Sequence, residues 1–137
     1  MGALSNYLEA RLLSLVFKNN GLSFSSPGDQ LWVAAFTSGL DLEAGLLTDE
    51  VVGGSYARVQ VPASGWDLTG SVVTNIDPVD FPVATAGWGS ITHGAILDSA
   101  TLESGNILWH GALTISRSIG IGDQLRFLAG EVEATLD

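Results

Sequence analysis

The chain has 137 residues, contains no cysteine, and carries 15 acidic against five basic residues, for a formal net charge of −10 at pH 7. This length indicates a single domain, and the absence of cysteine excludes disulfides, thiol nucleophiles and cysteine-ligated metals. Because nucleic acids and anionic membranes are bound through clustered Lys and Arg, the acidic balance argues against both as partners.

Few charges cover the surface of this domain, because only 15% of the residues are charged. We infer from this that a partner covers part of the surface, with a compact monomer of large core as the alternative. No segment reaches the roughly 18 apolar residues of a membrane span. We expect no signal peptide, because no basic region precedes the first apolar stretch.

Residues 1–20 have the apolar spacing of a helix, with Ser5 as a candidate N-cap. The apolar residues cover more than one side: Leu4, Leu8, Leu12, Leu15 and Val16 form a stripe, and Tyr7, Leu13 and Phe17 lie off it. A helix that is apolar on two sides is buried on two sides. The helix therefore either packs wholly against its own domain or inserts between subunits.

The rest of the chain consists of short segments rich in β-branched and aromatic residues, separated by Gly, Pro and Asn turn signals. The predicted strands cover 31–37, 56–62, 71–77, 90–98, 106–113, 113–119, 124–130 and 131–137. This pattern predicts an antiparallel β-sandwich or barrel. We divide the chain into an N-terminal helix that acts as an assembly arm, residues 1–20, and a β-sandwich domain, residues 21–137.

One long irregular stretch, residues 38–55, interrupts the strands and carries several apolar side chains, Leu46 and Leu47 among them. Long loops without secondary structure are often functional. A free loop would not expose so many apolar groups. We therefore expect this loop to lie at a contact between subunits or with another protein of an assembly.

Ser90, His93 and Asp98 are the residues that suggest catalysis. On a strand, however, Ser90 and His93 point to opposite faces, and Asp98 is too far along to contact His93. A Ser-His-Asp triad needs contact between successive members, and the strand-turn-helix motif of hydrolases is absent. We predict no enzymatic activity here and interpret His93 as a strand histidine bonded to a neighbour.

Metal and cofactor motifs are also missing from the sequence. His93 and His110 lack the short spacing of zinc motifs, which leaves open a site made from both and a distant carboxylate. The acidic loop 41–50 does not match an EF-hand, because Leu46 and Leu47 occupy its middle. No glycine-rich phosphate cradle is present. We expect no cofactor and no metal.

The chain has four tryptophans, at positions 32, 66, 88 and 109. Two of them lie in strand-like contexts where a core position is the default. Trp66 and Trp88 adjoin glycines and are the candidates for surface aromatics that could stack on a sugar.

Six motifs taken in order resemble a family of small tailed-phage virion proteins of the head-decoration or tail-fibre-like kind. They are MGALSNYLEARLL, LWVAAFTS, EVVGGSYARVQV, FPVATAGWGSITHGAILDSA, GNILWHGALT and GDQLRFLAGEVEATLD. The resemblance covers residues 1–137. It implies a jelly-roll β-sandwich after an N-terminal helix, and a structural role without catalysis.

We therefore expect a capsid decoration (cement) protein on the exterior of the virion head, where an acidic module is not attracted to packaged DNA. Its expected partners are the major capsid protein and two further copies of itself, in a trimer that stabilises the shell by mass action. A tail or tail-fibre component, or a host-surface adhesin using Trp66 or Trp88, is the alternative; an acidic hydrolase is a third. The expected assembly contacts are Leu4, Tyr7, Leu8, Leu12, Leu13, Phe17, Leu46 and Leu47.

Overall fold

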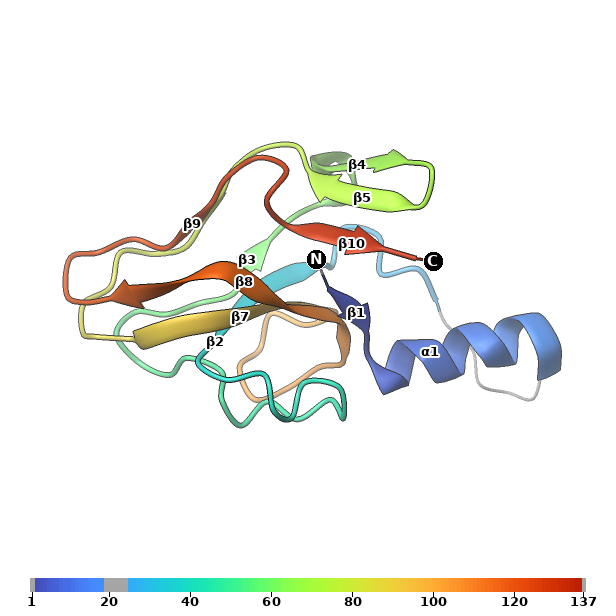
Figure 1. Cartoon of the computed structure of the whole chain (residues 1–137), viewed down its shortest axis with the longest axis horizontal. Coiled ribbons are helices and arrows are strands. Elements are labelled where there is room, and N and C mark those ends of the chain that lie inside the picture. The colour runs from blue at the N-terminus through green and yellow to red at the C-terminus, as the bar shows by residue number, and fades with distance from the viewer. Residues whose placement is uncertain (1, 19–24, 137) are drawn as a thin grey trace.

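The structure is a computed structural model that describes residues 2–18 and 25–136 (Figure 1). Its elements are β1 (Ala3–Leu4), α1 (Asn6–Leu13), the π-helix η1 (Ser14–Lys18), β2 (Trp32–Phe36), β3 (Val59–Gln60), the 3-10 helix η2 (Ala63–Gly65), β4 (Trp66–Thr69), β5 (Val72–Asn75), β6 (Val79–Asp80), β7 (Gly89–Leu97), β8 (Ile107–Ile119), β9 (Arg126–Phe127) and β10 (Glu133–Thr135). No helix in this part of the chain is long and apolar enough to cross a lipid bilayer.

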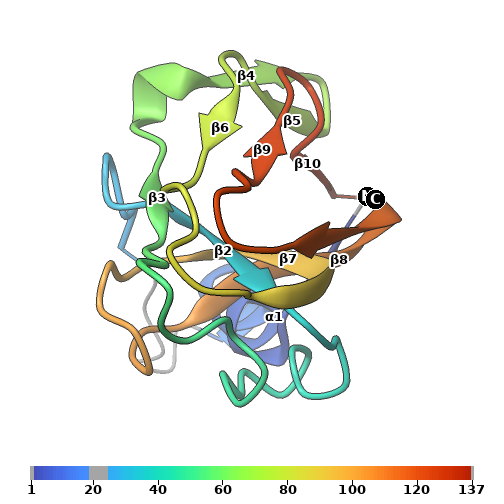
Figure 2. The same ribbon diagram turned by 90° about the vertical axis from the view of Figure 1, so that its left-hand side faces the viewer.

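The strands form two layers, as the end-on view of Figure 2 shows. One layer is a sheet with the order β1-β8-β7-β2-β3, and the other contains the sheet β10-β5-β4 and the pair β6-β9. Every pairing between these strands is antiparallel. The predicted class is confirmed as mainly β, with antiparallel sheets after an N-terminal helix.

The five-stranded sheet is covered on both faces at β2. Val33 and Ala35 face the main core between the layers. Ala34 and Phe36 face a second, smaller core on the other side, which Leu42 of the long loop completes. A strand buried on both faces reads as a continuous apolar run, and this accounts for the sequence WVAAF.

The predicted strand boundaries differ from the observed ones in two ways. The segments 106–113 and 113–119 form one strand, β8, because its ladder with β7 runs through both segments, with register shifts at Ile91/His93 and at Ile96/Leu97 of β7. Strands β1, β4 and β6 were not predicted. They span two to four residues, too few for a periodic signal.

The helix starts where it was predicted to start. Ser5 is the N-cap, and its hydroxyl oxygen accepts a hydrogen bond from the Leu8 backbone N–H. The same hydroxyl donates to the carbonyl of Ile107, which fixes the start of α1 to β8. The helix then runs away from the β domain (Figure 1). The predicted end of the helix, at residue 20, lies outside the described residues.

Candidate interaction surfaces

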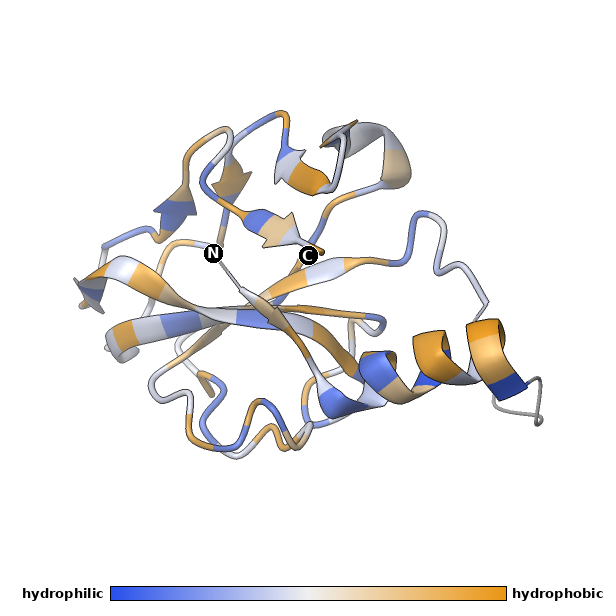
Figure 3. Ribbon diagram, turned by 45° about the vertical axis from the view of Figure 1, so that its right-hand side comes forward, coloured by the Kyte–Doolittle hydropathy of each residue, from blue (hydrophilic) through white to orange (hydrophobic). Residues whose placement is uncertain are grey.

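The far end of the N-terminal helix is an exposed apolar surface, which we call the helix tip (Leu13–Lys18). Leu13, Leu15, Val16 and Phe17 are between 59% and 74% exposed. Figure 3 shows this apolar end projecting beyond the β domain. Large apolar side chains that gather on a projecting element indicate an interaction site.

The structure separates the predicted assembly residues of the helix into two groups. Leu8 is buried within its own chain, and Leu4, Tyr7 and Leu12 are half-buried. Leu13 and Phe17 are exposed and belong to the helix tip.

Leu15, expected on the buried stripe, is exposed instead. The helix has left the sheet by this point, and the change from α to π geometry at Ser14 alters the residue spacing on which the stripe depends.

The helix also carries two cations that have no carboxylate partner among the described residues, Arg11 and Lys18. Arg11 lies over the ring of Tyr7, 4.9 Å from its centroid, and Lys18 is exposed at the end of η1. The other three cations are paired: Arg58 with Glu50, Arg117 with Glu131 and Arg126 with Asp80. The helix therefore presents unpaired positive charge on a strongly acidic chain.

A second apolar surface is a hollow of about 370 Å³ between the long loop and the turn that follows β7. We call it the loop hollow; it is lined by Leu47, Thr48, Glu50, Val51, Val52, Leu102 and Glu103. Val52 is 74% exposed. Leu46, outside the hollow, is also exposed, whereas Leu47 packs against the second core.

Sequence reasoning missed Leu102 and Glu103, which lie in a segment with turn composition. Glu103 has a φ of 61°, a left-handed conformation that is uncommon for a residue with a side chain. A leucine in a polar turn was the available signal, but it does not reveal which distant segment the leucine faces.

Glu50, which lines the loop hollow, belongs to a buried ion pair with Arg58. The carboxylate of Glu50 accepts hydrogen bonds from Arg58 and from the Tyr56 hydroxyl. Burial, together with the negative charge of Glu50, raises the pKa of Tyr56 far above its usual value, so this hydroxyl remains a neutral donor. Arg58 also donates to the carbonyls of Ser99 and Ser104. The network joins the two segments that frame the hollow.

The residues that suggested catalysis do not meet. His93 Nδ1 is 2.8 Å from the hydroxyl of Thr92, which confirms the interpretation of a strand histidine bonded to a neighbour. Asp98 instead binds the backbone and side-chain amides of Asn106. Ser90 is exposed near the start of β7.

The second histidine holds the long loop on the sheet. Nε2 of His110 is 2.7 Å from Oε2 of Glu43. Burial, and then the charge of His110, lower the pKa of His93 on the neighbouring strand. Within residues 2–18 and 25–136, no three His, Asp or Glu side chains gather closely enough to hold a metal ion.

The tryptophans proposed as surface aromatics are not free. Trp88 is buried, and its indole N–H donates to the carbonyl of Gly54. A Cβ at Gly54 would lie 2.8 Å from that indole nitrogen, so the absent side chain lets the ring enter the core. Its prediction as a surface residue is wrong. Trp66 is half-buried and donates to the carbonyl of Val61.

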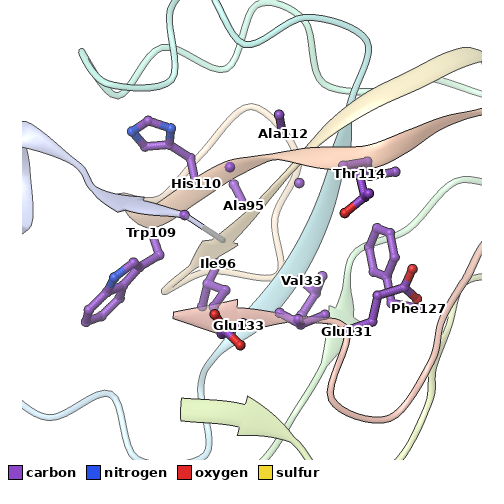
Figure 4. A pocket seen from close by; sticks show the side chains of 15 residues that line it. Val33, Ala95, Ile96, Trp109, His110, Ala112, Thr114, Phe127, Glu131 and Glu133 are labelled. Carbon is purple, nitrogen blue, oxygen red and sulfur yellow. The ribbon is translucent and has the colours of Figure 1, made fainter. Parts of the chain in front are cut away.

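A small cavity of about 90 Å³ lies between the two layers, next to β8 and β10 (Figure 4). Val33, Ile96 and Phe127 line it with apolar surface, and the ring of His110 points away from Val33 and Ile96. The carboxylate of Glu131 is occupied by Arg117. Ligand pockets usually measure about 300 Å³ or more, so this cavity is too small to indicate a substrate site.

Comparison with models of known protein families gives a match. The family model described as podophage GP4 fiber I protein gp80 matches residues 3–135. No curated protein matches the chain.

Proposed function

The chain belongs to the family of the podophage GP4 fiber I protein gp80, and from this we propose that it is a structural component of a phage fibre. The match covers almost the whole chain, so the predicted resemblance to phage virion structural proteins is confirmed. The observation that carries the finer proposal is the description of the family as a fibre protein. It supports the tail or fibre alternative better than capsid decoration.

A non-catalytic role agrees with the geometry of the described residues. His93 and Asp98 of the candidate triad have separate partners, and Ser90 is exposed. What the surface does offer is apolar area on the helix tip and around the loop hollow. Such surfaces suit assembly. The jelly-roll topology implied by the resemblance remains part of this proposal.

We further propose that copies of the chain associate through the helix tip, in a trimer. Burying one exposed Leu or Phe contributes about 1.5–3 kcal/mol, and the helix tip carries four large apolar side chains. Several such contacts offset the entropy cost of association.

Counting the protein in purified virions tests the fibre proposal. A fibre component is present in a few copies, whereas a cement protein that binds the major capsid protein is present in numbers comparable to the coat. Quantitative mass spectrometry gives the ratio, and antibody labelling in the electron microscope gives the position. Few copies at the tail or fibres are expected. Many copies over the whole head would show instead that the protein decorates the capsid exterior.

The association proposal is tested on the purified chain by replacing Leu15 and Phe17 with Ser. The double variant should fold normally and sediment as a monomer. Ile121→Ser is the matched control, because Ile121 is equally exposed but lies in a turn at the other end of the chain. If the control loses association as well, or the double variant keeps it, the helix tip is not the contact.

A further inference from the structure

We propose that the helix tip of one copy inserts into the loop hollow of a second copy, so that the chains join head to tail. The inference rests on the proposed function, in which copies associate through the helix tip, and it names the surface that receives the tip. The occupant of the loop hollow is thus a second copy of this chain.

The two surfaces match in their apolar character. The helix tip presents Leu15, Val16 and Phe17 to solvent. The loop hollow presents Val52 and Leu102, which come from segments far apart in the sequence. A hollow of about 370 Å³ has room for large side chains, and an anchor in an apolar pocket is the usual form of an interface hot spot.

The two surfaces also match in charge. Arg11, just before the tip, and Lys18, at its end, have no carboxylate partner in the described part of the chain. Glu103 is exposed at the rim of the hollow. Among the described residues, none that lines the hollow is a cation. Docking the tip there brings Lys18 toward Glu103, and complementary charges fix the register of an interface.

A cluster of helix tips from several copies is the other arrangement that would cover the apolar residues. It would bring the unpaired cations Arg11 and Lys18 of each copy close together, and juxtaposed like charges are costly. The hollow would bury the same apolar side chains and would place the acidic Glu103, not further cations, near Lys18. This favours the hollow over a cluster of tips as the partner surface.

The contact must form between chains. The helix tip projects from one end of the β domain, away from the long loop that frames the hollow (Figures 1 and 3). An interface between two different surfaces is heterologous, and it generates a closed ring when the rotation between copies closes and an open filament when it does not. Three such contacts in a ring would give the proposed trimer.

Mixing two defective variants tests the inference directly. Phe17→Asp disables the tip, and Val52→Asp disables the hollow; both residues are 74% exposed, so both variants should fold, which circular dichroism checks. Each variant alone should associate roughly ten- to a hundredfold more weakly than the wild type. Mixed together, they should form a one-to-one dimer, because the intact tip of one fits the intact hollow of the other. Ile121→Asp is the control and should associate normally.

Sedimentation and native mass spectrometry separate the outcomes. If Val52→Asp associates like the wild type while Phe17→Asp does not, the hollow is not the acceptor, and the inference fails although association through the tip stands. If the mixture forms no dimer, the contact is not heterologous and the inference fails. If both variants associate normally, or the wild type is monomeric, the proposed association fails too.

A charge exchange gives an independent test of register. Lys18→Glu and Glu103→Lys should each weaken association, and combining them in one chain should restore it. Restoration requires that these residues of two copies face each other. If association of the combined variant is weakened by the sum of the two separate losses, the proposed register is wrong.

Discussion

Arg58 and Glu50 form a buried ion pair that connects the two segments around the loop hollow. Nη2 of Arg58 is 2.7 Å from Oε1 of Glu50, and the two side chains are 0% and 4% exposed. The guanidinium also donates to the Ser99 and Ser104 carbonyls, each at 2.8 Å. One side chain thus holds the long loop against the turn after β7.

Replacing Arg58 with Met should destabilise the protein by about 3–5 kcal/mol, because Glu50 is left buried without a counter-charge. Two carbonyls of the turn also lose their donor. Chemical denaturation measures the change. The double variant Arg58→Met with Glu50→Leu is the control, and it should recover part of the loss because no charge stays buried. If the single and double variants are equally unstable, the cost is one of packing and not of an unpaired charge.

Leu8 and Leu15 should respond differently to the same truncation. Leu8 is 2% exposed and packs against its own domain, so Leu8→Ala should cost about 2–5 kcal/mol. Leu15 is 61% exposed, so Leu15→Ala should change the stability of the monomer by no more than about 0.5 kcal/mol. Thermal unfolding at a concentration where the chain is monomeric checks both. Equal costs would mean that the helix tip packs on the β domain.

The central strands and the helix could be predicted from the sequence because they carry periodic signals. The pattern of β7 and the apolar run of β2 locate both strands, and Ser5 marks the start of the helix. Strand β1 could not be predicted, since its two residues are a strand only through their pairing with β8. Tertiary contacts decide such short elements.

The candidate surfaces were predictable only in part. The breadth of apolar coverage on the helix predicted that Leu13 and Phe17 need a second partner. It did not predict where the helix leaves the domain, which is why Leu15 was misplaced. The loop hollow arises where residues 47–52 meet residues 102–103, and no local pattern shows that Arg58 joins them.

Gly39 should be intolerant of a side chain, because its backbone lies against the ring of His93. A Cβ at this position would be 2.3 Å from Nε2 of His93. Gly39→Ala must therefore displace the ring or the long loop, at a cost of about 1–3 kcal/mol. Gly87→Ala is the control, since its Cβ would lie 3.9 Å from its nearest neighbour, the carbonyl oxygen of Ile119, and the stability of this variant should change little. Denaturation midpoints measure both, and a tolerated Gly39→Ala would mean that the loop does not rest on His93.

His93 should make the protein less stable in mild acid. Its pKa is lowered from the ordinary value of 6.5, first by burial and then by the charge of His110. The groups around it are Thr92 on its own strand, His110 on β8, and Glu43 bound to His110. Because the folded state disfavours the charged ring, the unfolded chain binds more protons as the pH falls. The stabilising contribution is therefore present above pH 6.5 and is lost as the pH falls through the lowered pKa.

The Gln side chain of the variant His93→Gln does not titrate. The variant should therefore lose less stability than the wild type when the pH falls from about 7.5 to about 5. Most carboxylates titrate below this range. Urea denaturation at both pH values measures the two losses. His110 and Glu43 are unchanged in the variant, so the difference between the two losses reports chiefly on His93. Equal losses in the two proteins would show that protonation of His93 does not lower the free energy of unfolding.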